Sequence, residues 1–546
     1  MAGRVERDRA ALNRLPRWAV LALAAIPVAG LALFFVAPLV TLLTRVLGPG
    51  SVRDVLRTPG LGRVLWFTLW QALASTALTL LVGFAPAYVL ARYRFAGRRA
   101  VLASVTVPFM LPTVVVGAAF LALLPDAWHG TARAVILAHV FFNIAVVVRL
   151  LGSMWSTVPQ QLTAAARTLG ASPWKLLRHV VLPLLKPGLW AAATVVFLFT
   201  FTSFGTVRLL GGAANTTLEV EIARRATQLG DVDGAAVLAV LQLVVLGAVV
   251  WLSSRFQRRG ALPLAGAPLA RRPRTRGQRW LVRGVAGGVT VMMTVPLAVM
   301  VSRSFLLGGR WSLAAWRTLG RTEVRPGVSL GVDPLASLFM SLRFAALASL
   351  ISVVVGALAA LAIGAARRHG RLLDIGLMLP LGTSAVTVGL GILITFDVAP
   401  IDWRAKWWLI PVGHALVATP FVVRALVLVL RAIPADQRAA AAVLGASPWR
   451  AWWAIDVRRI ATPLAGAAGL AAAISLGEFG ATTFLTRSGR ETMPIAIARL
   501  LGRTGEVPRA QGFALAAMLL SATAVIVMVA DRGMAGQREV LDARGA

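Results

Sequence analysis

The sequence contains no cysteine among its 546 residues, which excludes disulfide bonds and thiol chemistry. Charge is also scarce: 14% of the residues are Asp, Glu, Lys or Arg, against about a quarter in soluble globular proteins. The chain has three lysines, Lys175, Lys186 and Lys406, and none follows a glycine as the lysine of a phosphate-binding loop does. We therefore expect no ATPase and no catalytic residues in this chain, and no side chains show metal-site spacing.

What the sequence does contain is apolar residues, at 58% of the chain, with a mean hydropathy of +0.77. Runs of about twenty such residues recur, and each is long enough to cross the hydrocarbon core of a membrane as a helix. The net charge of +35 comes from arginines that mostly border these runs. Arginines in such places orient helices and meet anionic headgroups, so we expect membrane lipid as a partner and no nucleic acid.

We predict an all-α polytopic membrane protein with about twelve transmembrane helices. The predicted spans are 18–43, 64–90, 101–124, 132–154, 188–204, 234–253, 281–302, 338–365, 373–396, 407–430, 462–485 and 511–530. The N-terminus and the loops after the second, sixth and eighth spans are rich in arginine, which places them, and with them both termini, in the cytoplasm. The domains expected are a cytoplasmic N-terminal segment at 1–17, a first unit at 18–253, a basic cytoplasmic linker at 254–280, a second unit at 281–530 and a cytoplasmic tail at 531–546.

The chain is internally duplicated. The hexapeptide LGASPW occurs at 169–174 and again at 444–449, a shift of 275 positions. The same shift aligns His139 with His414, and Phe204-Gly205 with Phe479-Gly480. An even number of spans in each half makes the repeats parallel, so they are related by a pseudo-two-fold axis along the membrane normal. We therefore predict a pathway at the interface between two six-helix halves.

The repeated hexapeptide predicts a sharp corner between two short helices in the loop after the fourth span. Gly170 suits the left-handed position that closes a helix, Ser172 is a good N-cap and Pro173 fits the first position of the next helix. Trp174 then leads the second helix, and Pro183 is expected to end or kink it. The second copy has the same residue types in the same roles, at Gly445, Ser447, Pro448 and Trp449.

Two interpretations of these corners remain open on local features. A helix pair lying at the lipid headgroups, anchored by tryptophan, would have the same composition. However, a lipid-lying helix needs only amphipathicity, whereas this defined corner recurs in the same loop of both halves. The duplication favours a partner with two equivalent sites.

Ionisable and polar side chains within the spans are candidates for the pathway. Glu478 lies in the eleventh predicted span and Ser203 is its repeat equivalent, while Asn143 lies in the fourth span. A carboxylate on the pathway suits a cationic substrate. The alternatives are a carboxylate at a helix end, paired with an arginine or hydrated, and, for Asn143, His139 and His414, hydrogen bonds between helices.

The corner segment resembles the loop that permeases of binding-protein-dependent ABC importers carry between membrane helices, with consensus E-A-A-x-x-x-G-x9-I-x-L-P. In the first copy Gly170 takes the glycine position, Val180 the isoleucine and Leu182-Pro183 the ending. In the second copy Gly445 and Ile455 match, but Val457-Arg458 replaces Leu-Pro. Both copies carry an alanine triplet in the E-A-A place, at Ala164, Ala165 and Ala166 and at Ala439, Ala440 and Ala441.

The resemblance implies a permease subunit in a prokaryotic plasma membrane, with each corner acting as a coupling helix on an ATP-hydrolysing subunit. Its implied partners are two copies of a cytoplasmic ABC ATPase and an extracytoplasmic substrate-binding protein. ATP is then used by the partner, and this chain binds no cofactor. Because the acidic residue of the motif is missing in both copies, shape and apolar packing are left to carry the docking.

Within that family, the fused two-unit layout resembles the thiamine and ferric-iron importer permeases. ILAHVFFN at 136–143 and the stretch at 201–222 are most similar to the thiamine branch, while GEFG at 477–480 is of a type also seen in iron permeases. Thiamine is thus the first expectation for the substrate and ferric iron the second. The alternative function is an ion-coupled secondary transporter with two six-helix halves, which shares a parallel repeat but needs no duplicated corner.

Overall fold

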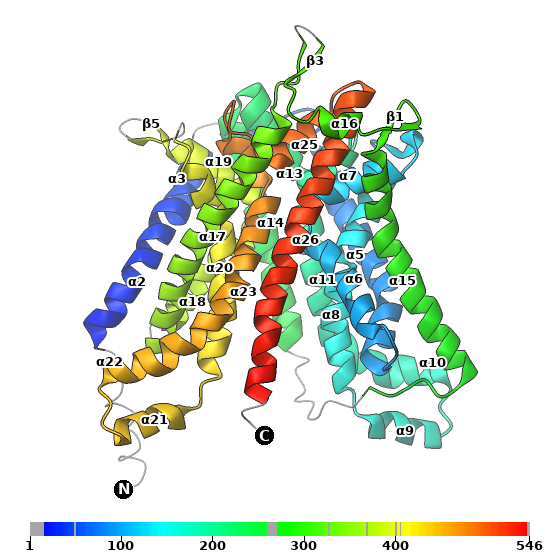
Figure 1. The fold of residues 1–546 in the computed structure, drawn as a ribbon, viewed down its shortest axis with the longest axis vertical. Helices are drawn as coiled ribbons and strands as arrows, with labels where there is room; N and C mark the ends of the chain where they lie inside the picture. Colours follow the sequence, from blue (N-terminus) through cyan, green and yellow to red (C-terminus); the bar gives the residue numbers. More distant parts are fainter. Residues whose placement is uncertain are drawn as a thin grey trace.

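A computed structural model describes residues 16–48, 51–258, 270–325, 328–366, 370–398, 401–403 and 406–542. Most of the predicted N-terminal segment, residues 259–269 of the predicted linker and residues 543–546 of the predicted tail lie outside these ranges. The described part is built of helices, with three short two-stranded hairpins, which confirms the predicted all-α class. Figure 1 shows these helices running roughly side by side between two ends of the molecule.

The long helices and the corner helices occur in the same order in both halves, whereas some short elements occur in one half only. The elements of the first half are α2 (Arg17–Leu31), η1 (Ala32–Val36), α3 (Ala37–Val46), α4 (Ser51–Leu56), α5 (Leu61–Arg92), α6 (Arg98–Met110), α7 (Thr113–Leu123), η2 (Asp126–Trp128), α8 (Ala132–Thr157), α9 (Gln160–Thr168), α10 (Pro173–Leu176), η3 (Leu177–Val181), α11 (Leu182–Phe201), α12 (Gly205–Leu210), α13 (Leu218–Arg224), η4 (Arg225–Leu229) and α14 (Val232–Arg258).

The second half follows the same plan from α15 onward. Its helices are α15 (Arg276–Arg303), α16 (Ala314–Arg317), α17 (Pro334–Ala365), α18 (Gly370–Met378), η5 (Leu379–Gly382), α19 (Ala385–Thr395), α20 (Leu409–Arg431), α21 (Ala435–Val443), α22 (Pro448–Ala451), η6 (Trp452–Val457), α23 (Arg458–Gly477), α24 (Gly480–Leu485), α25 (Met493–Leu501) and α26 (Glu506–Asp542). Its three antiparallel hairpins are β1 (Leu306–Leu307) with β2 (Arg310–Trp311), β3 (Glu323–Arg325) with β4 (Val328–Ser329), and β5 (Asp397–Val398) with β6 (Ile401–Asp402).

Nine helices in the described ranges are long and apolar enough to cross a membrane, or up to twelve if three bent pairs each count as one span. Two spans predicted as continuous, 101–124 and 373–396, are wrong in that respect. The first is α6 and α7 meeting at 106°, and the second is α18–η5 and α19 meeting at 99°. Pro112 explains the first break, because it lacks an N–H and restricts Leu111 to extended backbone (φ −75°, ψ 146°).

The fifth and eleventh predicted spans also differ from the structure. Helix runs without interruption from α10 through η3 to the end of α11, so Pro183 does not end the second short helix. The wide π-helical turn η3 directly precedes Pro183 and leaves room for a residue that cannot donate to the helix ladder. The chain breaks instead after Phe201, and after Gly477 in the second half. Helices α14 and α15 extend into both ends of the predicted linker, to Arg258 and from Arg276.

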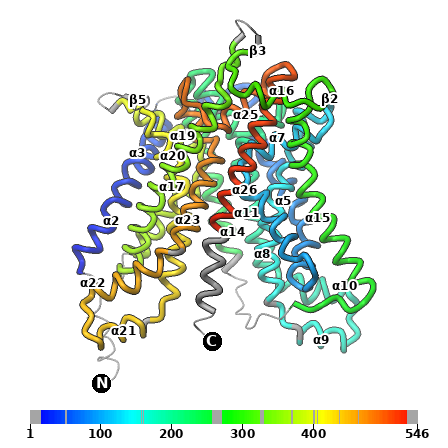
Figure 2. Tube along the Cα trace, viewed as in Figure 1, coloured from blue at the N-terminus to red at the C-terminus, as the bar shows by residue number. Residues whose placement is uncertain are grey.

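The first long helix of each half packs on the opposite half. Helices α2 and α3 lie against α17 and α19, whereas α15 lies against α5, α6 and α7. The colours of Figures 1 and 2 show this exchange, with blue α2 beside yellow-green α17 and green α15 beside blue α5. Both exchanged helices expose large apolar side chains such as Trp18, Leu21 and Trp280, as expected of helices that face lipid. Each half is therefore held by a helix from the other.

The largest apolar core is shared by both halves, and two smaller cores lie mainly in one half each. One cluster contains Val114 and Phe204 of the first half together with Leu390 and Phe479 of the second. Two smaller clusters lie mainly in one half each: the one around Trp155 in the first half, and the one around residues 422–430 in the second, where Leu23 and Leu31 of the exchanged α2 pack against it. Figure 1 shows the corner helices α9–α10 and α21–α22 on opposite sides of the end away from the shared core. The halves thus join at one end and carry their corners at the other.

Candidate functional site: two exposed corners and an axial cluster

The first corner is closed by two backbone hydrogen bonds at the end of α9. The N–H of Gly170 donates to the carbonyl of Arg167 at 2.9 Å, and the N–H of Ala171 donates to the carbonyl of Ala166 at 3.0 Å. This pair of bonds is the Schellman arrangement, in which the residue after the helix takes the left-handed conformation. Gly170 has φ +79°, a conformation that costs an L-residue about 1–2 kcal/mol.

The next helix starts immediately, and the second corner repeats the whole arrangement. The hydroxyl of Ser172 accepts a hydrogen bond from the N–H of Lys175 at 3.3 Å, with Pro173 in the first turn. In the second copy Gly445 also has φ +79°, and Ser447 accepts from the N–H of Arg450 at 3.3 Å. The structure therefore has the predicted cap geometry at both corners.

Both corners present apolar side chains to the surroundings. Leu169 is 87% exposed and Leu444 is 86% exposed, and more than half of Trp174 and of Trp449 is exposed. The alanine triplets lie alongside, with Ala164, Ala165, Ala439 and Ala440 exposed and Ala166 and Ala441 half-buried. Figure 1 places α9 and α21 at the extremity of this end. Apolar groups gathered on a rigid, exposed corner are typical of a docking surface.

The axis of the molecule is marked by a contact between repeat equivalents. Phe204 and Phe479 occupy the same place in the two halves, and their ring centroids lie 4.9 Å apart. Two residues related by a two-fold axis touch only where both lie beside that axis. The phenylalanine pair therefore lies on the predicted pathway between the halves.

Chain breaks from four helices meet around this pair. A side chain at Gly205 would collide with Oγ1 of Thr113 and lie 3.2 Å from a ring carbon of Phe479. In the second half, a Cβ at Gly477 would lie 3.3 Å from Cα of Pro112. Non-helical backbone at membrane depth is tolerated only inside protein or around a cavity, and broken helices line the substrate sites of transporters. Because Gly205 and Gly477 have no side chain, the broken helices can approach one another closely at the axis.

Two buried carboxylates belong to segments that pack between the halves, one from each half. Glu478 follows the last turn of α23, and its Oε1 accepts a hydrogen bond from the N–H of Ala481 at 2.8 Å. Glu219 on α13 is fully buried, and its Oε1 accepts a hydrogen bond from the amide of Gln242 on α14. Helix α13 packs against α19 of the second half, whose N-cap is Ser384. A Cβ at Gly480, two residues after Glu478, would lie 3.2 Å from Cβ of Ala385, so the start of α19 adjoins both acidic segments. We call Phe204, Glu219, Ser384, Glu478 and Phe479 the axial cluster.

The three predicted pathway residues lie in different surroundings. Glu478 is buried as expected, but at a break in the eleventh span rather than within a continuous helix. Ser203 is buried directly before Phe204, so it borders the axial cluster. Asn143 is buried in α8, and its described hydrogen bond stays in that helix, from Nδ2 to the carbonyl of His139 at 2.9 Å.

The two predicted histidine equivalents hold helices together. Nδ1 of His139 lies 3.2 Å from Oγ of Ser75, and His414 contacts Ser475 at 2.8 Å and Thr482 at 2.7 Å. This confirms the interhelical hydrogen bonding that was one of the sequence alternatives.

Sequence reasoning missed Glu219 and Ser384. Glu219 falls between the fifth and sixth predicted spans, although Leu218, Val220 and Ile222 around it are apolar and favour a buried segment. In the structure this segment is α13, which enters the interior. Ser384 stands one residue before α19 and caps it, accepting a hydrogen bond from the N–H of Thr387 at 3.1 Å.

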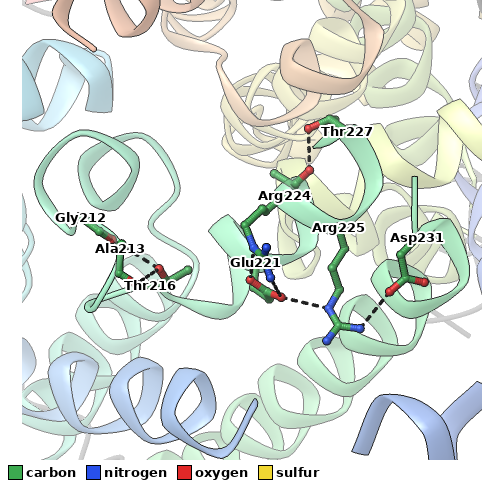
Figure 3. Close-up of polar contacts among 9 residues, drawn as sticks. Gly212, Ala213, Thr216, Glu221, Arg224, Arg225, Thr227 and Asp231 are labelled. Atoms are coloured by element: carbon green, nitrogen blue, oxygen red, sulfur yellow. Dashed lines mark hydrogen bonds and ion pairs between the residues drawn. The ribbon is translucent and has the colours of Figure 1, made fainter. Parts of the chain in front are cut away.

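A network of charged side chains lies at the C-terminal end of α13, on the side of the molecule away from the corners. Figure 3 shows Glu221 accepting hydrogen bonds from Arg224 at 2.8 Å and from Arg225 at 3.0 Å, while Arg225 also reaches Asp231 at 3.0 Å. Burial alone would raise the pKa of Glu221, but the two arginines outweigh it and lower that pKa. Two open hollows of about 600 Å³ each adjoin the network, and Arg225 lines both. This surface is hollowed and charged, unlike the apolar corners.

A duplicated helical membrane protein with broken helices meeting on its axis and an exposed corner on each half is a transport permease. Residues 83–260 match the family described as the binding-protein-dependent transport system inner membrane component. The probable ABC transporter permease protein y4fN of Sinorhizobium fredii is 26% identical over 535 residues, covering 88% of this chain and 89% of the relative.

Two further relatives are thiamine transport system permease proteins ThiP. The protein of Salmonella typhimurium is 26% identical, covering 86% of this chain and 88% of the relative, and that of Brucella abortus is 27% identical, covering 88% and 89%. The chain is therefore a fused, two-unit permease subunit of a binding-protein-dependent ABC importer, and it crosses the inner membrane many times.

Proposed function

We propose that this permease imports thiamine across the plasma membrane, using ATP hydrolysed by two identical ATPase subunits docked on its two corners. A substrate-binding protein delivers thiamine to the opposite face, at the hollowed and charged surface around Arg225. Helix α2 begins and α26 ends at the corner end, in support of cytoplasmic termini (Figure 1). Ferric iron, the second candidate, would need more ligands than two carboxylates, and no group of three His, Asp or Glu side chains suited to a metal occurs in the described ranges.

The observation that carries this proposal is the duplicated corner. An ion-coupled secondary transporter has no use for two rigid, apolar corners of identical backbone geometry at one end. Two ATPase subunits that close on ATP would draw the corners together. Because the largest apolar cluster joins the two halves away from the corners, the halves can rock about it and expose the axial cluster to alternate sides. Each corner then transmits force only as long as its backbone stays rigid.

The double variant Gly170→Val with Gly445→Val tests this role. Valine is strained at φ +79°, so both corners are expected to change shape while the membrane helices still insert. In proteoliposomes with the ATPase and the binding protein, we expect thiamine uptake to fall at least tenfold and ATP hydrolysis to lose its stimulation by loaded binding protein.

Gly489→Val is the matched control. Gly489 also has a positive φ, +78°, and a Cβ there meets nothing within 4 Å, but it lies between α24 and α25, away from the corners. This variant should bind the ATPase with unchanged affinity. Normal uptake and normal stimulation in the double corner variant would overturn the coupling role.

A further inference from the structure

The axial cluster holds two carboxylates but no described positive charge. Described arginines pair with other acidic groups, such as Glu221, Asp231 and Glu491, and none forms an ion pair with Glu219 or Glu478. One oxygen of Glu219 accepts from Gln242, while its Oε2 is buried without a hydrogen-bonding partner. An unpaired ionised carboxylate is costly inside a membrane protein, so such a group either takes up a proton or binds a cation.

The two carboxylates are not repeat equivalents, which argues against a purely structural pair. The shift of 275 aligns Glu219 with Pro494 and Glu478 with Ser203. Helix α13 of the first half and the α23–α24 break of the second thus each bring one acid to the axis from a different element. A site built from non-equivalent residues lacks two-fold symmetry, so it can match a substrate that is itself asymmetric.

The remaining side chains of the cluster favour an aromatic ligand. Phe204 and Phe479 meet on the axis beside Glu478, and their rings present π faces that attract cations and stack on planar rings. Ser384 adds a hydroxyl at the start of α19, the helix that packs against α13. From this combination we propose that the axial cluster is a transient binding site for an aromatic organic monocation, with Glu219 and Glu478 sharing its positive charge and the two phenylalanines contacting its rings.

This inference rests on the proposed import of thiamine. It names the residues that select for the positive charge of the substrate. In the state seen here the phenylalanine pair closes the axis where the halves share a core. When the halves rock, the rings separate and a ligand can occupy the place between the carboxylates. The site then holds the cation in the interval between release from the binding protein and exit at the corner end.

Charge-neutral variants test the site in the complete transporter. We compare Glu219→Gln, Glu478→Gln and the double variant in proteoliposomes with ATPase and saturating binding protein. Two probes are used, thiamine and its uncharged thiophene isostere. We expect thiamine uptake to fall at least tenfold in each single variant, and the ratio of thiamine to isostere uptake to fall toward one in the double variant. Glu219→Asp and Glu478→Asp should keep the preference for the cation.

Glu491→Gln is the matched control, because Glu491 is as buried as Glu478 but has a partner, Arg499, at 2.9 Å. It is expected to lower thermal stability without changing the thiamine-to-isostere ratio. An unchanged ratio in a folded double variant would refute the axial site while leaving thiamine import intact. Absence of thiamine uptake by the unmodified transporter would instead refute the proposed function. If the double variant does not fold, the single variants and their aspartate counterparts decide.

Discussion

The two corners present the same exterior but are supported by different interiors. Behind the second corner, Nε of Arg438 donates to Asp456 at 3.2 Å, and the rings of Trp449 and Trp452 lie 4.9 Å apart. The first corner has Thr163 and Val181 at the positions of that ion pair. It is supported by an apolar cluster that includes Leu176 and Val181. Salt-bridged and apolar supports therefore hold the same backbone turn.

This difference shows which features of the corner the two halves share. Leu169 and Leu444 are equally exposed, and Gly170 and Gly445 have the same φ, although the buried side chains beneath them differ. Two copies of one ATPase need the same exposed corner surface on each half. The buried side chains that support that surface can differ between the halves. The comparison can be tested by changing the support, the exposed surface and the caps separately.

The largest effect is expected from Asp456→Ala, which removes the partner that holds Arg438. Asp456 is buried, so the substitution should destabilise the second half by about 2 kcal/mol, less than for a fully buried pair because Arg438 is one-third exposed. The midpoint of thermal unfolding in detergent measures this loss.

The exchange Arg438→Thr with Asp456→Val gives the second corner the residues of the first. Apolar replacement of a buried ion pair is often neutral, so we expect this double variant to recover most of the lost stability. Equal destabilisation by the double variant and by Asp456→Ala would show that the second corner depends on its ion pair.

An intermediate effect is expected from the exposed leucines. Leu169→Ala and Leu444→Ala each remove contact area from a docking surface, so each should weaken ATPase binding by about 1 kcal/mol, roughly fivefold. Binding of purified ATPase to the permease in nanodiscs measures the change, and unfolding should not change. Leu229→Ala, which truncates an exposed leucine away from the corners, is the control. A comparable loss in the control would exclude specific docking.

The smallest effect is expected from the caps. Ser172→Ala and Ser447→Ala each remove one N-cap hydrogen bond of 3.3 Å, worth about 0.5–1 kcal/mol. Hydrogen exchange at the amides of Lys175 and Arg450 should become faster by similar factors in the two corners, while Ser→Thr variants should retain protection. Faster exchange in one corner alone would show that their caps are not equivalent.

Local residue chemistry made the corners predictable. A left-handed residue after a helix favours glycine, and a serine-proline pair favours the start of the next helix, whatever surrounds them. The apolar runs likewise predicted a polytopic membrane protein, because their length matches the membrane thickness. The breaks in the third and ninth spans were missed, since hydropathy is the same for a straight helix and for one bent at Pro112.

The sequence by itself determined the membrane class, the parallel duplication and both corners, because each depends on composition or on short-range backbone preference. The exchange of α2 and α15 between halves, the contact of Phe204 with Phe479 and the packing of α13 against α19 were decided only by the tertiary structure. These contacts join residues hundreds of positions apart, and they form because packing at the axis brings broken helices of both halves together. The repeat located the axis in the sequence, but only packing places two non-equivalent acids beside it.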